Sequence, residues 1–136
     1  MVQILVVDDE PDIRLALSLC LEESGYEVSE ASDGSEVMAA VAAERPDLIL
    51  LDISMPHMDG FQTLEQLKSD AGTRDIPVVM VSARQRSEDQ RDARALGAID
   101  FISKPWIDGE LELKTQWALH RGKPGKVPER PVLVAT

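Results

Sequence analysis

Cysteine is nearly absent from this chain: Cys20 is the single one among 136 residues, which excludes an internal disulfide. Aromatic residues contribute only 4% of the sequence and hydrophobic residues 43%, so we expect a core of Val, Ile, Leu and Ala side chains. Long apolar runs are missing as well, because charged residues interrupt each run well before the roughly 18 residues of a membrane span. These absences, together with the length, predict one soluble globular domain.

Basic residues are also scarce. The chain has 14 Lys and Arg against 25 Asp and Glu, which gives a formal net charge of −11. This charge opposes binding to nucleic-acid phosphates or to an anionic membrane surface, so we expect neither as a direct partner. Met1 leads directly into the segment Val2–Val7, without the basic segment and long apolar run of a secretory signal. We therefore expect a cytoplasmic location.

Short apolar runs bounded by polar residues indicate strands that are buried on both faces of a parallel sheet. Three runs are clear and two are weaker: Ile4–Val7, Leu48–Leu51 and Val78–Val81, then Val28 and Ile99–Ile102. Segments with helical periodicity lie between them. Five strands that alternate with five helices predict right-handed crossover connections and a doubly wound α/β domain.

Capping residues mark the beginnings of several predicted helices. Asp33 precedes the second helix, and Asp59 with Gly60 opens the third. Ser87 with Gln90 predicts a capping box on the fourth helix, which Gly97 would close, and the fifth is expected over Ile107–His120.

The composition changes after Arg121, where Gly, Pro and Lys become frequent. We expect a domain at 1–121 and a Pro/Gly/Lys-rich linker or tail at 122–136. The apolar residues Val132–Ala135 leave three alternatives open: a strand added to a sheet edge, the start of a following domain, or a frayed end.

Polar residues follow four of the predicted strands, at the carboxyl ends where open α/β sheets bind their ligands. They are Asp8 and Asp9, Asp52, Ser82 and Lys104. Three adjacent carboxylates would repel one another without a cation, and their hard oxygens suit Mg²⁺. Mg²⁺ and the lysine would neutralise a transferring phosphoryl group, and the serine hydroxyl could donate to it. Asp52 is then the expected nucleophile, which would form an acyl phosphate.

Four motifs contain these residues and occur in a fixed order: Asp8-Asp9-Glu10, Asp52–Gly60, Val81-Ser82-Ala83 and Lys104-Pro105. Over about residues 1–121 the chain resembles the response-regulator receiver domains of two-component signalling, a family that includes chemotaxis regulators. The resemblance implies a flavodoxin-like fold with a single five-stranded parallel sheet in the order 2-1-3-4-5.

The resemblance also implies the role of each site residue. Asp52 would be the phosphoacceptor. Asp9, Asp52 and the backbone carbonyl of Ser54 would bind Mg²⁺ directly, and Asp8 would act mainly through water. Lys104 would contact the phosphoryl oxygens, and the bond before the proline that follows it is expected to be cis.

Ser82 and Phe101 would form a switch pair, in which the hydroxyl moves toward the phosphoryl group and the ring turns inward. The family more often has Thr and Tyr at these two positions. Arg84 and the side chain of Ser54 lie where the family varies its dephosphorylation rate.

As a receiver, the chain would accept its phosphoryl group from a sensor histidine kinase or a histidine phosphotransfer protein. It would catalyse only its own phosphorylation and dephosphorylation, and so would not be a turnover enzyme. The signal would pass through the fourth helix, fifth strand and fifth helix. Expected recipients are a downstream effector, a fused output domain, or a second copy in a homodimer formed on phosphorylation.

Simpler interpretations exist for each residue alone: Asp8 as a helix cap, Ser82 as a turn residue, Lys104 as a solvated charge and Phe101 as core. Two other functions are alternatives for the chain as a whole. One is a docking or dimerisation unit without regulated phosphorylation. The other is a Mg²⁺-dependent phosphatase, which would require an Asp-x-Asp spacing that Asp8-Asp9-Glu10 lacks.

Overall fold

Five parallel strands form one sheet in the order β2-β1-β3-β4-β5. The computed structural model describes residues 1–55, 57–84 and 86–121, so the expected tail at 122–136 lies outside the described residues. The strands are β1 (Gln3–Val7), β2 (Glu27–Ala31), β3 (Leu48–Leu51), β4 (Val78–Ser82) and β5 (Asp100–Ser103). The predicted doubly wound α/β fold and its strand order are confirmed.

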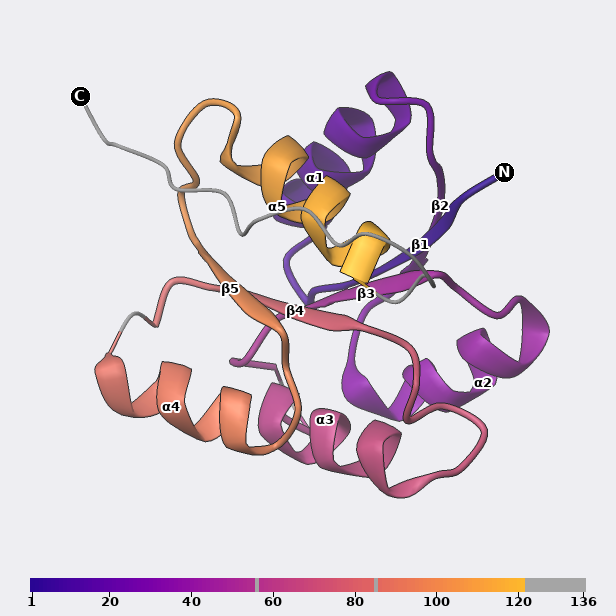
Figure 1. Ribbon diagram of the computed structural model, residues 1–136, viewed down its shortest axis with the longest axis vertical. Coiled ribbons are helices and arrows are strands. Elements are labelled where there is room, and N and C mark those ends of the chain that lie inside the picture. The colour runs from indigo at the N-terminus through magenta and orange to yellow at the C-terminus, as the bar shows by residue number, and fades with distance from the viewer. Residues whose placement is uncertain (56, 85, 122–136) are drawn as a thin grey trace.

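Helices cover both faces of this sheet. On one face lie α1 (Pro11–Glu23) and α5 (Glu110–Arg121), and on the other lie α2 (Val37–Ala43), α3 (Gly60–Ser69) and α4 (Ser87–Ala95) (Figure 1). A short 3-10 turn, η1 (Gly34–Glu36), precedes α2. Among the helices that the structure describes, each is too short or too polar to cross a membrane.

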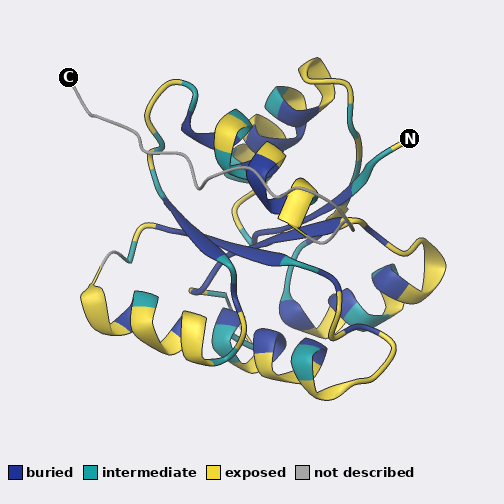
Figure 2. Ribbon diagram, in the orientation of Figure 1, coloured by how far each residue is buried: buried dark blue, intermediate teal, exposed yellow. Residues whose placement is uncertain are grey.

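The side chains of the central strands alternate between two apolar clusters, one on each face of the sheet. Leu5, Ile49 and Met80 point toward α2, α3 and α4. Their neighbours Ile4, Leu50 and Val81 point toward α1 and α5. Figure 2 shows the result: the central strands are buried, whereas the edge strand β2 is largely exposed or half-buried, and the helices are exposed on their outer sides. The continuous apolar runs of the sequence therefore report strands that are covered on both faces.

The helix ends follow the sequence in part. The predicted start of the third helix is confirmed, because Asp59 is the N-cap of α3 and forms a capping box with Gln62. The capping box predicted on α4 is wrong: no side chain caps its first turn. The fifth helix begins at Glu110 and not at Ile107, because Gly109 has a positive φ of 84° that a helix does not accommodate.

Candidate functional site

The sheet fixes the backbone of three charged site residues, Asp8, Asp52 and Lys104, each one position beyond the end of a strand. The amide of Asp52 donates to the carbonyl of Val7 (3.0 Å), and that of Lys104 donates to Ser82 (3.0 Å). The amide of Asp8 likewise donates to the carbonyl of Ala31 at 3.2 Å. The ladder of parallel pairing therefore extends into the site, and these side chains start from fixed positions.

The alternation of each strand also continues into the site. Asp8, Asp52 and Lys104 each come two positions after a strand residue that points toward α1 and α5, so their side chains continue on that face. Ser82 comes two positions after Met80, which points toward α2, α3 and α4. The alternation thus separates the ionic cluster from the hydroxyl, although both lie at the carboxyl edge of the sheet.

Lys104 joins the carboxylates of the cluster. Its Nζ lies 2.6 Å from Oδ2 of Asp8, 3.5 Å from Oδ2 of Asp52 and 3.8 Å from Oε1 of Glu10. Burial by itself lowers the pKa of Lys104, but the hydrogen bond to Asp8 and the charges of Asp52, Asp8 and Glu10 outweigh it and raise the pKa. The lysine is therefore a fixed positive charge beside Asp52.

Asp52 is 3% exposed, and the pKa of its carboxyl group is raised. Burial, followed by the charge of Asp8, raises its pKa from 3.8 to about 6. Lys104 and the amide of Ser54, which donates to this carboxylate, oppose the rise without cancelling it. Two buried carboxylates with one lysine carry excess negative charge, so the pocket favours an added cation.

A metal ion could be held at the loop after β1. The ligand oxygens of Asp8, Asp9 and Glu10 all lie within 4.8 Å of one another, and hard carboxylate oxygens suit Mg²⁺. Asp52 is outside this group of three, but burial raises its pKa and the charges of Asp8 and Asp9 add to this effect. The donor set therefore fits Mg²⁺. The direct ligands expected from the sequence, Asp9, Asp52 and the Ser54 carbonyl, stay a prediction.

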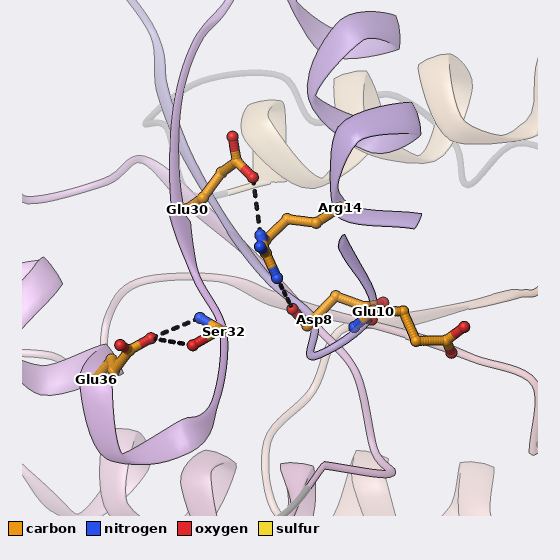
Figure 3. Close-up of polar contacts among 6 residues, drawn as sticks. All are labelled: Asp8, Glu10, Arg14, Glu30, Ser32 and Glu36. Atoms are coloured by element: carbon orange, nitrogen blue, oxygen red, sulfur yellow. Dashed lines mark hydrogen bonds and ion pairs between the residues drawn. The ribbon is translucent and has the colours of Figure 1, made fainter. Parts of the chain in front are cut away.

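The loop that carries these acids is anchored from two other elements, as Figure 3 shows. Arg14 of α1 donates to the carbonyl of Asp8 (2.7 Å) and pairs with Glu30 of β2 (2.9 Å). The amide of Glu10 donates to Oδ1 of Asp8 at 2.9 Å, which turns the chain into α1. Sequence reasoning missed Arg14, although its place one turn into the helix beside the acidic motif was a usable signal.

A close approach of α3 holds the backbone of Asp52. A Cβ atom on Gly60 would lie 2.2 Å from the Asp52 carbonyl oxygen and 2.7 Å from Cα of Ile53, so only glycine fits. The amide of Gly60 donates to the carbonyl of Ile53 at 2.7 Å. The Asp-Gly pair at the start of α3 thus serves two purposes, since Asp59 caps the helix and Gly60 lets it touch the strand.

The proposed switch pair occupies the other side of the site. Ser82 is 1% exposed, and its hydroxyl oxygen accepts from the amide of Arg84 at 3.1 Å. The Phe101 ring is 7% exposed and belongs to the apolar cluster under α4. The bond between Lys104 and Pro105 is cis, as expected from the resemblance. A switching role for Ser82 and Phe101 stays a prediction.

An open α/β sheet of this strand order, with an acidic pocket and a buried aspartate paired with a lysine at its carboxyl edge, defines a receiver domain. The family model for the response regulator receiver domain matches residues 4–116, and the chain belongs to this family. Proteins of this family are signalling switches of two-component systems, and they typically bind Mg²⁺ in an acidic pocket.

Individual relatives fall into two groups by length. Protein PilH of Pseudomonas aeruginosa is 40% identical over 115 residues, which cover 85% of this chain and 94% of PilH. The phosphate regulon transcriptional regulatory protein PhoB of the same organism is 37% identical over 131 residues, 96% of this chain but 57% of PhoB. The crystal structure of the chemotaxis protein CheY4 of Vibrio cholerae superposes with a TM-score of 0.78 at 34% identity, covering 85% of this chain and 96% of CheY4. The chain thus spans little more than half of the transcriptional regulator PhoB.

Proposed function

We propose that the chain is a phosphorylation switch that accepts a phosphoryl group on Asp52 from the phosphohistidine of a kinase or phosphotransfer protein. The observation that carries the proposal is the pairing of the buried Asp52 with Lys104, whose side chain is 8% exposed, 3.5 Å apart at the carboxyl edge of β3. A carboxylate in this position can act as a nucleophile, and Lys104 lies close enough to neutralise the negative charge of the phosphoryl group that it would gain.

In the transfer step, one carboxylate oxygen of Asp52 attacks the phosphorus of the phosphohistidine. The new P–O bond forms as the P–N bond breaks, and the electron pair of that bond returns to the imidazole nitrogen, which solvent protonates. Lys104 neutralises the charge of the phosphoryl oxygens. Hydrolysis ends the signal when water attacks phosphorus, the bond to Asp52 breaks, and inorganic phosphate leaves as the carboxylate is restored.

Asp8 and Asp9 would hold Mg²⁺, with Asp52 and the carbonyl of Ser54 completing the ligand set. When bound, the ion would supply positive charge to the transferring phosphoryl group. The tight cluster of carboxylate oxygens after β1 and the raised pKa of Asp52 support this dependence. A phosphoryl-transfer role in the cytoplasm, with no turnover of external substrates, belongs to the same proposal.

The output surface would be formed by α4, β5 and α5, through the switch pair Ser82 and Phe101. Two large apolar side chains of this part of the chain are accessible to a partner: Leu113 of α5 is 41% exposed, and Ile107, between β5 and α5, is 39% exposed. The partner would be an effector protein, a fused output domain or a second copy of this chain.

Labelling by acetyl phosphate tests the proposal directly. Wild type in Mg²⁺ should take up one phosphoryl group, which phosphate-affinity gel electrophoresis and intact mass would detect, and EDTA should prevent it. Asp52→Asn should take up none. Asp12→Asn is the matched control, because it removes an exposed aspartate from the first turn of α1. Stoichiometric labelling of Asp52→Asn would rule out Asp52 as the acceptor.

A further inference from the structure

The loop after β4 contains an ionic cluster that the functions proposed above do not use. Asp89, in the first turn of α4, is 3% exposed, and both of its carboxylate oxygens are occupied. Oδ1 lies 2.9 Å from Arg84 and Oδ2 lies 3.2 Å from Arg86. Buried carboxylates are normally paired in this way, but here both partners come from the loop that leads out of the site.

Arg84 links this buried carboxylate to the proposed switch residue. Its guanidinium group reaches Asp89 and also lies over the ring of Phe61 in α3, 5.8 Å from the ring centre. Its backbone amide donates to the hydroxyl oxygen of Ser82 at 3.1 Å. One residue therefore contacts Ser82 through its main chain and Asp89 through its side chain.

These contacts restrain Ser82 in the conformation seen here. A hydroxyl that is to donate to a phosphoryl oxygen on Asp52 must leave or share its contact with the Arg84 amide. A shift of the Arg84 main chain with the hydroxyl would strain the contacts of its side chain with Asp89 and Phe61. A ligand shifts a conformational equilibrium only by its difference in affinity for the two states. Contacts that stabilise the state in which Ser82 is bonded to the Arg84 amide therefore lower the apparent affinity for a phosphoryl group, which needs the other state.

We propose that Asp89 is a positioning residue for phosphoryl binding: by holding Arg84 it restrains the Ser82 hydroxyl and lowers the affinity of the site for a phosphoryl group. This inference rests on the proposed function of Asp52. Asp89 acts through two other residues and touches no reacting atom.

The test is a double-mutant cycle between Asp89 and Ser82 in the full chain, read as the affinity for beryllofluoride in Mg²⁺ by calorimetric titration. Asp89→Asn should tighten beryllofluoride binding about threefold to tenfold, the range for losing a partly exposed charge-assisted contact. In a Ser82→Ala background the same substitution should change the affinity less than about twofold, because no hydroxyl is left to restrain.

Three further variants guard against a general effect on folding or charge. Asp89→Glu keeps a carboxylate within reach of Arg84 and should restore an affinity close to that of wild type. Arg84→Met removes the other partner of the same ion pair, the arginine, whose side chain is partly exposed. It should tighten beryllofluoride binding as Asp89→Asn does. This variant tests the inference even if Asp89→Asn fails to fold. Asp92→Asn removes an exposed charge from the same helix and should leave the affinity unchanged.

Tightening that depends on Ser82 supports the inference. Equal tightening in both backgrounds overturns it, since the freed arginine would then act on the phosphoryl group without Ser82. Unchanged or weaker binding in Asp89→Asn and Arg84→Met also overturns it. If wild type binds no beryllofluoride, the proposed function of Asp52 fails and the inference falls with it, whereas binding with an additive cycle refutes the inference alone.

Discussion

Two helices on the same face of the sheet, α3 and α4, are attached in different ways to the strands that carry the site. α3 follows Asp52, begins with a capping box, contacts the Asp52 backbone at Gly60 and buries Leu64 and Leu67 in the core. α4 follows Ser82, has no side-chain cap on its first turn, and buries only Asp89 and Ala93.

The difference teaches where this fold is rigid and where it can respond. Packing and a close backbone contact hold the side of Asp52. On the side of Ser82, ionic contacts replace packing, and such contacts can be exchanged at a smaller cost in free energy. The largest effects of substitution on stability should therefore come from α3 and the smallest from the start of α4.

Matched leucine truncations should show the widest gap. Leu64→Ala should lower the free energy of unfolding by about 4 kcal/mol, because Leu64 is fully buried in the core beneath α3. Leu96→Ala, at the end of α4, should cost only about 1 kcal/mol, since Leu96 is half-buried. Urea unfolding would measure both, and similar losses would remove the distinction between the two helices.

The charge on Asp52 should have the next largest effect on stability, and it opposes folding. The pKa of Asp52 is about 6 in the folded chain against 3.8 ordinarily, so the folded chain binds more protons between these values and stability falls as pH rises through this window. Asp52→Asn should therefore be more stable than wild type above pH 6, by up to about 3 kcal/mol, with the gain vanishing below about pH 4.

Unfolding of both proteins in EDTA across this pH range would measure the gain. On the other side of the comparison, Ser82→Ala should give a difference from wild type that does not vary with pH, because no carboxylate is changed. A constant offset for Asp52→Asn would contradict the assignment of the raised pKa to Asp52.

A methyl group at Gly60 should have a medium effect. Gly60→Ala should cost about 2 kcal/mol, since the added carbon meets the backbone of Asp52 and Ile53, which cannot give way as a flexible side chain could. Gly72→Ala is the control, because its nearest neighbour is the Asp70 carboxylate at 3.2 Å, and should change stability little. Thermal unfolding of the two variants would decide.

The smallest expected losses of stability come from a pair of variants that compares the starts of α3 and α4 directly. Asp59→Ala removes the cap of α3 and should cost about 1 kcal/mol. Ser87→Ala, where the sequence predicts an equivalent cap on α4, should cost close to nothing, because the described residues at the start of α4 show no side-chain capping hydrogen bond. A clear loss of stability in Ser87→Ala would show that Ser87 caps α4 and would contradict the structure at this position.

The sequence predicts this fold well because buried parallel strands leave a strong signal. The three clear apolar runs match β1, β3 and β4 closely, and the polar residues that follow them lie at one edge, since parallel strands all end there. Of the predicted site residues, the structure brings Lys104 together with Asp8 and Asp52, whereas the strand alternation turns Ser82 toward the other face.

The features that sequence reasoning missed depend on contacts between distant residues. A serine followed three residues later by glutamine resembles a capping box, but it cannot reveal that Asp89, between them, is bound to Arg84 and Arg86. Likewise, the positive φ of Gly109 delays the fifth helix, which the sequence predicts to begin at Ile107.

Because the backbone hydrogen bonds run one residue past the strand ends, the proposed phosphoryl uptake depends on the native register of the strands. A slip by one residue in β1 or β3 would turn Asp8 or Asp52 to the opposite face of the sheet and separate it from Lys104. A molecule that takes up a phosphoryl group has therefore paired these strands in the native register. In refolding experiments, phosphoryl uptake would count correctly paired molecules, whereas helix content would include mispaired ones.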